Sequence, residues 1–98
     1  MFGIRFARRA VGELKRLGAH ERALVLDEIE RCLGDGPQEP SRNGKELSAL
    51  VPPWDHVPPV GELRVGDHRV FYDVDAGARL VTVRAVRRKG RSTTREII

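Results

Sequence analysis

One stretch of this chain decides its fold: Glu62-Leu63-Arg64-Val65-Gly66-Asp67-His68-Arg69-Val70-Phe71-Tyr72-Asp73-Val74-Asp75. Apolar and polar side chains alternate on both sides of Gly66-Asp67, a pair that suits a two-residue turn whose first position favours glycine. The stretch therefore predicts a β-hairpin. Alternation places Val70, Tyr72 and Val74 on one face of the hairpin, and it places Arg69, Phe71 and Asp73 on the other.

The flanking residues extend this hairpin into an α+β fold. Leu80 to Val86 is strongly apolar and predicts a further strand, and Phe2 to Phe6 alternates as a short first strand. Apolar stripes at helical spacing predict two helices, over about Ala7–Leu17 and His20–Leu33. We expect the helices to form an antiparallel hairpin on one face of a small, mostly antiparallel sheet, and the other face to stay open.

All six prolines fall between residues 35 and 59, where little periodicity is present. This region is predicted to be a long loop, with at most a helical turn over Lys45–Leu50. The total of 98 residues leaves room for one domain, which we expect to span residues 1–98.

The whole chain has a net charge of +4. This positive excess is concentrated in the last part of the chain. Residues 1–58 carry nine basic and nine acidic side chains, whereas residues 59–98 carry nine basic and five acidic ones. Six cations and no acid fall between Arg84 and Arg95. Such asymmetry is typical of proteins that bind nucleic acid or acidic peptides. The alternative is a solvated basic tail.

Several classes of protein are disfavoured by the sequence. The three histidines are scattered and Cys32 falls on a predicted core face, so we expect no metal site. The chain has no GxGxxG motif and no Walker loop, so no cofactor is expected. A lone cysteine favours a reducing compartment, and the first residues show neither a signal peptide nor a membrane span. These features predict a cytoplasmic protein with no membrane partner.

Arginines on the predicted open face are the strongest candidates for chemistry. Arg64 and Arg69 could each hold a phosphate through the planar fork of the guanidinium group. They could instead pair with neighbouring acids and only stabilise the sheet. Histidine is the residue type best suited to proton transfer, but alternation points His68 toward the helices. Trp54 is expected to pack at the edge of the core.

The order of the elements and the residues quoted above resemble the RelE/ParE superfamily of type II toxin–antitoxin toxins. The resemblance covers nearly the whole chain. It implies a toxin that is neutralised by an antitoxin whose C-terminal segment wraps around it. In the RelE branch it implies metal-independent cleavage of mRNA on the ribosome, and in the ParE branch it implies inhibition of DNA gyrase. Beyond residues 62–75, the resemblance is carried by Leu14-Lys15-Arg16-Leu17, Lys45-Glu46-Leu47 and Val83-Arg84-Ala85-Val86.

The resemblance also implies roles for single residues. Arg69 matches an arginine that acts on the scissile phosphate, and Arg88 or Lys89 falls near a second phosphate-binding cation. Two departures concern proton transfer. Val60 and Glu62 stand where RelE-type enzymes carry lysines, and Thr93-Thr94-Arg95 stands where they carry a tyrosine.

Because the usual proton carriers are missing, Glu62, His68 or Lys89 would have to provide the general acid and base. We therefore predict a toxin, expected to be an mRNA endonuclease in which Arg64, Arg69 and Arg88 or Lys89 bind phosphate. The alternatives are a gyrase inhibitor and a catalytically inactive toxin-fold binding protein. A cognate antitoxin should place an acidic segment against Arg84–Arg95, because burying those charges unpaired would be costly.

Overall fold

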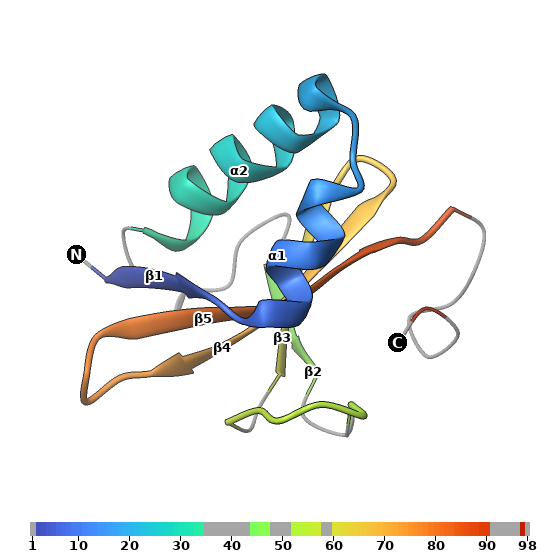
Figure 1. Ribbon diagram of the computed structural model, residues 1–98. Helices are drawn as coiled ribbons and strands as arrows, with labels where there is room; N and C mark the ends of the chain where they lie inside the picture. Colours follow the sequence, from blue (N-terminus) through green and yellow to red (C-terminus); the bar gives the residue numbers. More distant parts are fainter. Residues whose placement is uncertain (1, 35–43, 48–51, 58–59, 91–96, 98) are drawn as a thin grey trace.

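A computed structural model describes residues 2–34, 44–47, 52–57, 60–90 and 97. Its strands form one five-stranded sheet in the order β1-β5-β4-β3-β2, in which only β1 and β5 run parallel (Figure 1). The predicted α+β fold with a mostly antiparallel sheet is therefore confirmed. The elements are β1 (Gly3–Phe6), α1 (Arg8–Lys15), α2 (Ala19–Leu33), β2 (Gly44–Leu47), β3 (Val60–Val65), β4 (His68–Asp75) and β5 (Leu80–Arg88).

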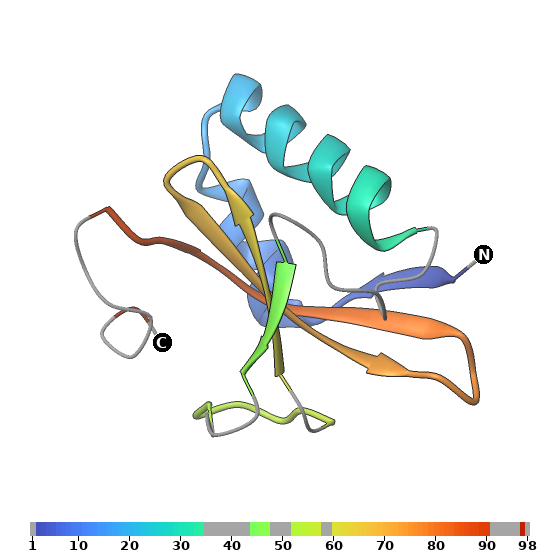
Figure 2. The ribbon, with the colours of Figure 1, turned by 180° about the vertical axis from the view of Figure 1, so that it is seen from behind.

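Strand β2 corrects the expected helical turn at Lys45–Leu50. Gly44–Leu47 pairs antiparallel with β3 at the edge of the sheet, as the view from behind shows (Figure 2). Residues 48–50 lie outside the described part of the chain. The strand forms because β3 offers a row of unpaired backbone groups, which the four residues satisfy. Such tertiary pairing overrides the weak local pattern of the segment.

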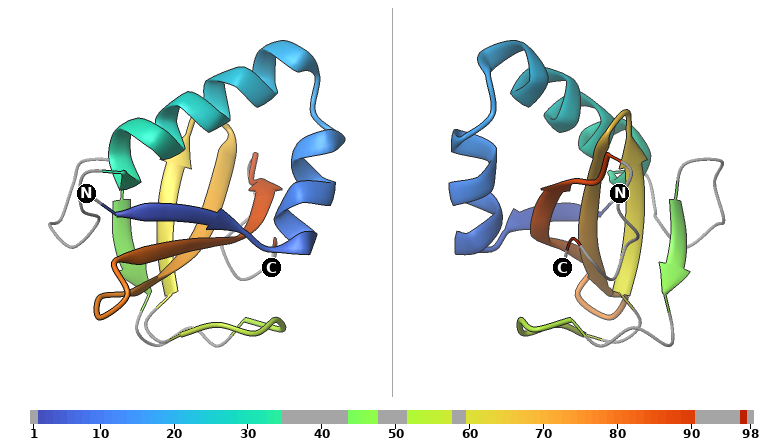
Figure 3. Two further views of the ribbon diagram at one scale, coloured as in Figure 1. Left: turned by 60° about the vertical axis from the view of Figure 1, so that its left-hand side comes forward. Right: turned by 90° about the vertical axis from the view of Figure 1, so that its right-hand side faces the viewer.

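The two helices lie on one face of the sheet, as predicted. They diverge from their shared turn instead of packing antiparallel along their length, so that part of the prediction is wrong (Figure 3). Helix α1 packs against β5, whereas α2 crosses toward β3. Arg22 of α2 fixes this corner, because its guanidinium group donates hydrogen bonds to the carbonyl oxygens of Leu14, Lys15 and Leu17 at the end of α1. No helix in the described ranges is long and apolar enough to cross a membrane.

The main hydrophobic core fills the space between the helices and the sheet. Val70 and Tyr72 point into it, so the alternation predicted for β4 holds on this side. Burial of apolar side chains in this core is the largest favourable contribution to folding. The buried members are Ala10, Leu14, Val25, Ile29, Leu33, Leu63, Val70, Tyr72, Val81, Val83 and Val86.

The second face of the sheet is partly covered, so the prediction of an open face is wrong around Phe71. Val60, Phe71 and Ala85 form a second buried cluster, with Trp54 and Ile97 packed against it. Residues 52–57 pass along this side, opposite the helices (Figure 3). The Trp54 and Phe71 ring centroids lie 5.8 Å apart. Left uncovered, Phe71 would expose a large apolar surface, and packing by Trp54 removes that surface from water.

A β-bulge between β4 and β5 changes which side chains share this second face. Tyr72 pairs with Val83 and Phe71 pairs with Ala85, so Arg84 is an extra residue on β5. Beyond the bulge the alternation of β5 is shifted by one position. Arg87 therefore lies on the second face with Ala85.

Candidate nucleic-acid interface

Three arginines from three adjacent strands form a row on the second face. Arg64 of β3 pairs across the sheet with Arg69 of β4, and Arg69 pairs with Arg87 of β5. Residues directly opposite each other in antiparallel strands share a face, with Cβ atoms about 4.5–5.5 Å apart, and like charges in these positions destabilise the sheet. Sheet stability alone does not account for such an arrangement. We call Arg64, Arg69 and Arg87 the arginine row.

Arg69 occupies the centre of the row and is bound to the hairpin turn. Its side chain is buried, and its Nη1 donates hydrogen bonds to the carbonyl oxygens of Gly66 at 2.8 Å and His68 at 2.9 Å. The turn itself requires glycine at position 66, where φ is +57°. Since only Nη1 makes these bonds, the rest of the guanidinium fork has no hydrogen-bond acceptor among the described residues.

Arg87 is held in the row by Glu13, and neither residue was among the predicted phosphate-binding or proton-transfer residues. Glu13 of α1 is buried. Its Oε1 accepts a hydrogen bond from the Val86 N–H at 2.9 Å, and its Oε2 forms an ion pair with the Arg87 guanidinium group. The first contact satisfies the edge of β5 beyond the end of β1. The second contact fixes the direction of the Arg87 side chain. Only the bulge brings Arg87 to this face, and no local pattern in the sequence predicts that bulge.

Trp54 joins the row to α1. The Cζ atoms of Arg9 and Arg87 lie 5.5 Å and 5.8 Å from the centre of its ring, within the range of cation–π interaction. Its packing on Phe71 confirms the predicted position at a core edge. Sequence reasoning did not connect Arg9 to this surface, because α1 and residues 52–57 are far apart in the chain.

The predicted proton carriers do not all lie near the row. Nε2 of His68 lies 3.5 Å from a carboxylate oxygen of Glu21 on α2, so this histidine faces the helices, as alternation predicts. Arg88 is directly opposite His68 and shares that face. The structure therefore places His68 and Arg88 away from the arginine row.

Glu62 and Lys89 lie closer to the row. Glu62 pairs with Phe71 and so lies on the second face, one row from Arg64 and Arg69, where it is 4% exposed. The backbone N–H of Lys89 donates to the carbonyl oxygen of Asp67 at 2.7 Å, which places Lys89 beside the hairpin turn. Of the carriers predicted from the sequence, Glu62 therefore shares the face of the arginine row, and the backbone of Lys89 lies beside the hairpin turn.

Asp73 is a further acid on this face, and it has a structural role. The Arg84 Nε donates to its Oδ2 at 2.7 Å, and the Val57 N–H donates to the same oxygen at 3.0 Å. These bonds fasten residues 52–57 to the sheet. Within the described ranges, no group of three or more His, Cys, Asp or Glu side chains could hold a metal ion.

Cys32 on α2 is remote from this surface and has an unreactive environment. Burial raises the pKa of its thiol, and a hydrogen bond from the thiol to Glu28, at 3.5 Å, raises it further. The pKa of Glu28 is lowered, chiefly by its hydrogen bonds from Arg31. A raised thiol pKa reduces the thiolate fraction on which cysteine reactivity depends. The sequence places Cys32 on a predicted core face, and in the structure it packs against the main core.

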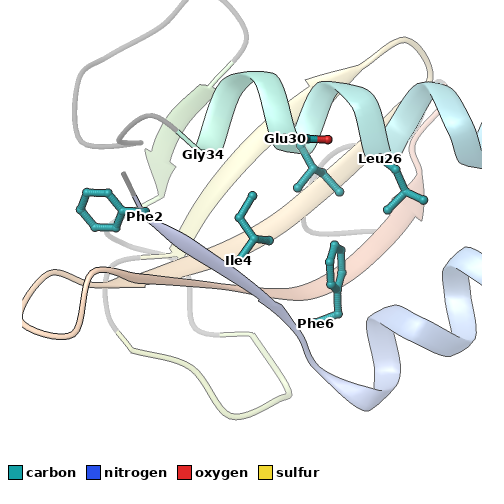
Figure 4. Close-up of a pocket in the computed structure, with 7 residues that line it drawn as sticks. Phe2, Ile4, Phe6, Leu26, Glu30 and Gly34 are labelled. Atoms are coloured by element: carbon teal, nitrogen blue, oxygen red, sulfur yellow. The ribbon is translucent and has the colours of Figure 1, made fainter.

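An apolar groove of about 660 Å³ lies on the helix side, between β1 and α2 (Figure 4). Its charged lining residue is Glu30, and the other side chains offer no groups for acid–base or phosphate chemistry. The groove is therefore distinct in character from the arginine row. It is lined by Phe2, Ile4, Phe6, Leu26, Ile29, Glu30 and Gly34.

Comparison with known proteins identifies relatives of this chain. Residues 4–93 match the family model described as ParE toxin of type II toxin-antitoxin system, parDE. No curated protein sequence matches. Among solved structures, the archaeal RelE–RelB complex from Pyrococcus horikoshii is similar with a TM-score of 0.70 and 18% identity, covering 93% of this chain and 98% of the other.

Two further structures show the same arrangement. The RelBE2 toxin–antitoxin complex from Mycobacterium tuberculosis has a TM-score of 0.63 and 26% identity, covering 89% of this chain and 90% of the other. The isolated RelE toxin from E. coli has a TM-score of 0.62 and 19% identity, covering 98% of this chain and 93% of the other.

Proposed function

We propose that this chain, which belongs to the ParE toxin family of type II toxin–antitoxin systems, is a ribosome-associated mRNA endonuclease. The arginine row with Glu62 beside it is the observation that carries this proposal. A row of guanidinium forks suits the phosphates of a polynucleotide. A carboxylate beside the row suits abstraction of a proton from a nucleophile next to the bound phosphate.

The reaction that fits these groups is attack of an RNA 2′-hydroxyl on the adjacent phosphorus. Glu62 would take the 2′-hydroxyl proton as the new P–O bond forms, and Arg64 and Arg69 would stabilise the charge that develops on the phosphoryl oxygens. The bond from phosphorus to the 5′-oxygen breaks, which leaves a 2′,3′-cyclic phosphate. Lys89, placed beside the turn, would give a proton to the departing 5′-oxygen.

Glu62→Gln tests this assignment in a reconstituted translation reaction, with primer extension on the reporter mRNA as the readout. The wild-type chain should cut translated mRNA, and Glu62→Gln should slow cutting by roughly 10²- to 10⁴-fold, the usual contribution of a general base. Asp27→Asn is the matched control, because Asp27 is an exposed carboxylate on α2. Undiminished cutting by Glu62→Gln would remove Glu62 from the mechanism.

Inhibition of DNA gyrase is the second candidate, and the family description as a ParE toxin favours it. A gyrase supercoiling assay run beside the translation reaction separates the two functions. Intact mRNA together with blocked supercoiling would replace the endonuclease proposal with this one.

A cognate antitoxin is the partner that we infer. Related RelE toxins have been solved in complex with their RelB antitoxins. Arg88 is exposed at the end of β5 and presents positive charge there, which an acidic antitoxin segment would neutralise. The rest of the predicted contact region, from residue 91 onward, lies outside the described residues.

A further inference from the structure

Two buried N–H donors beside the arginine row have no acceptor among the described residues. They are the indole Nε1 of Trp54 and the guanidinium Nε of Arg87. Nearly all buried donors in folded proteins are hydrogen-bonded, and an unpaired one costs free energy comparable to a lost hydrogen bond. Both donors belong to side chains that are in contact with each other. Their shared position indicates an acceptor from outside the described chain.

The charge around these donors indicates that the acceptor is an anion. Arg9 lies over the Trp54 ring and forms no ion pair or hydrogen bond with another described residue. Two acids are nearby. The two oxygens of Glu13 already contact the Val86 N–H and the Arg87 guanidinium group, and Asp55, which follows Trp54 in the chain, is exposed. The buried groups that remain unpaired here are donors, and Arg9 adds a positive charge beside them.

We propose that Arg9, Trp54 and Arg87 form a second phosphate subsite, which extends the arginine row toward α1 and binds a neighbouring phosphate of the same nucleic-acid strand. Arg87 belongs to both sites, so the two are continuous across β3, β4, β5 and α1. A track of cations repeated over several elements matches a polymer with a charge on every unit. The identification of the strand as RNA rests on the proposed function, but the phosphate contact itself does not.

Trp54 is the single tryptophan of the chain, so its fluorescence reports directly on this subsite. We would titrate the full chain with a short single-stranded RNA carrying 2′-O-methyl groups, which blocks cleavage but keeps the phosphates. Saturating RNA should change the Trp54 emission. Arg9→Ala should weaken binding by about five- to tenfold at low salt and reduce the dependence of log Kd on log salt by about one phosphate contact.

Arg8→Ala is the matched control, because Arg8 is the exposed neighbour on α1 and its loss changes net charge equally. Binding by Arg8→Ala should stay within about twofold of wild type, since screened surface charge has little effect away from a contact. Equal weakening by the two variants, or unchanged Trp54 emission at saturation, would overturn the subsite. A Trp54 response to a poly-glutamate peptide but not to RNA would also overturn it, and would assign the surface to an acidic protein.

The RNA-binding test of the subsite gives a result whether or not the chain cleaves mRNA. If the wild-type chain leaves mRNA intact but the Arg9 and Trp54 effects are present, the endonuclease proposal fails and the subsite stands. If mRNA is cut but these effects are absent, the subsite fails alone.

Discussion

The two faces of the sheet use the same strands for different purposes. The helix face buries apolar side chains from α1, α2, β3, β4 and β5 against one another. The second face has a small apolar cluster around Phe71 and, beside it, the arginine row and Glu62. Arg69 is buried on this face and is hydrogen-bonded to the hairpin turn, because burial of unpaired charge is costly. The comparison shows that one face chiefly stabilises the fold and that the other combines a smaller stabilising cluster with the charged surface.

Phe71→Ala should have the largest effect and would test whether the second face also contributes to stability. Phe71 is fully buried, so its truncation should lower the free energy of unfolding by about 3–5 kcal/mol. Leu63→Ala makes the matched change on the helix face, where the loss should be about 2–5 kcal/mol. Urea denaturation followed by circular dichroism measures both. A loss below about 1 kcal/mol for Phe71→Ala would show that the covering by Trp54 is loose and that the second face is functionally open.

The alternation of the central hairpin predicted most of this division between faces. Val70 and Tyr72 were assigned to the helix side and Arg69 and Phe71 to the other, and the structure agrees. Such assignments succeed because side-chain direction in a strand is fixed by a period of two. The covering of Phe71 was not predictable, because residues 52–57 show no periodicity and reach the sheet only through tertiary contacts.

The composition of the arginine row was only partly predictable. Arg64 and Arg69 follow from the hairpin alone, whereas Arg87 depends on the extra residue at Arg84. A bulge inserts one residue and moves every following side chain to the opposite face. Strict alternation beyond position 84 would have kept Arg88 on the second face in place of Arg87. The role of Glu13 was equally hidden, since a single acid on a helix gives no sign of the strand edge that it satisfies.

Glu13→Gln should have an intermediate effect on stability. It tests the contact between α1 and β5, where the two faces of the sheet meet. The glutamine carbonyl oxygen can still accept the Val86 hydrogen bond, so the edge of β5 stays satisfied, but the ion pair with Arg87 is lost. We expect a loss of about 1.5–3 kcal/mol in the free energy of unfolding, typical of a hydrogen bond to a charged group. Thermal unfolding at low and high salt measures it. Glu30→Gln, at an exposed site on α2, is the control and should be close to neutral. Equal stability of the two variants would show that Glu13 does not hold Arg87.

The smallest expected effect is the contribution of Cys32 to stability. Its dependence on pH tests how well the helix face excludes water. Burial raises the pKa of its thiol in the folded chain, and the bond to Glu28 adds to this. In the unfolded chain the thiol titrates near its ordinary value of about 8.5. The stability that this group contributes is therefore fully present below that pH and is lost as pH rises through the folded pKa, because the unfolded state releases its proton first.

The measurement is the difference in free energy of unfolding between wild type and Cys32→Ala across that alkaline range, which cancels the other titrating groups. The wild-type advantage should shrink as pH rises, and Glu28→Gln should reduce the change because it removes one of the two causes. A difference that stays constant with pH would mean that the thiol is as well solvated in the folded chain as in the unfolded one. The edge of the helix face would then be more open to water than the burial of its neighbours Ile29 and Leu33 indicates.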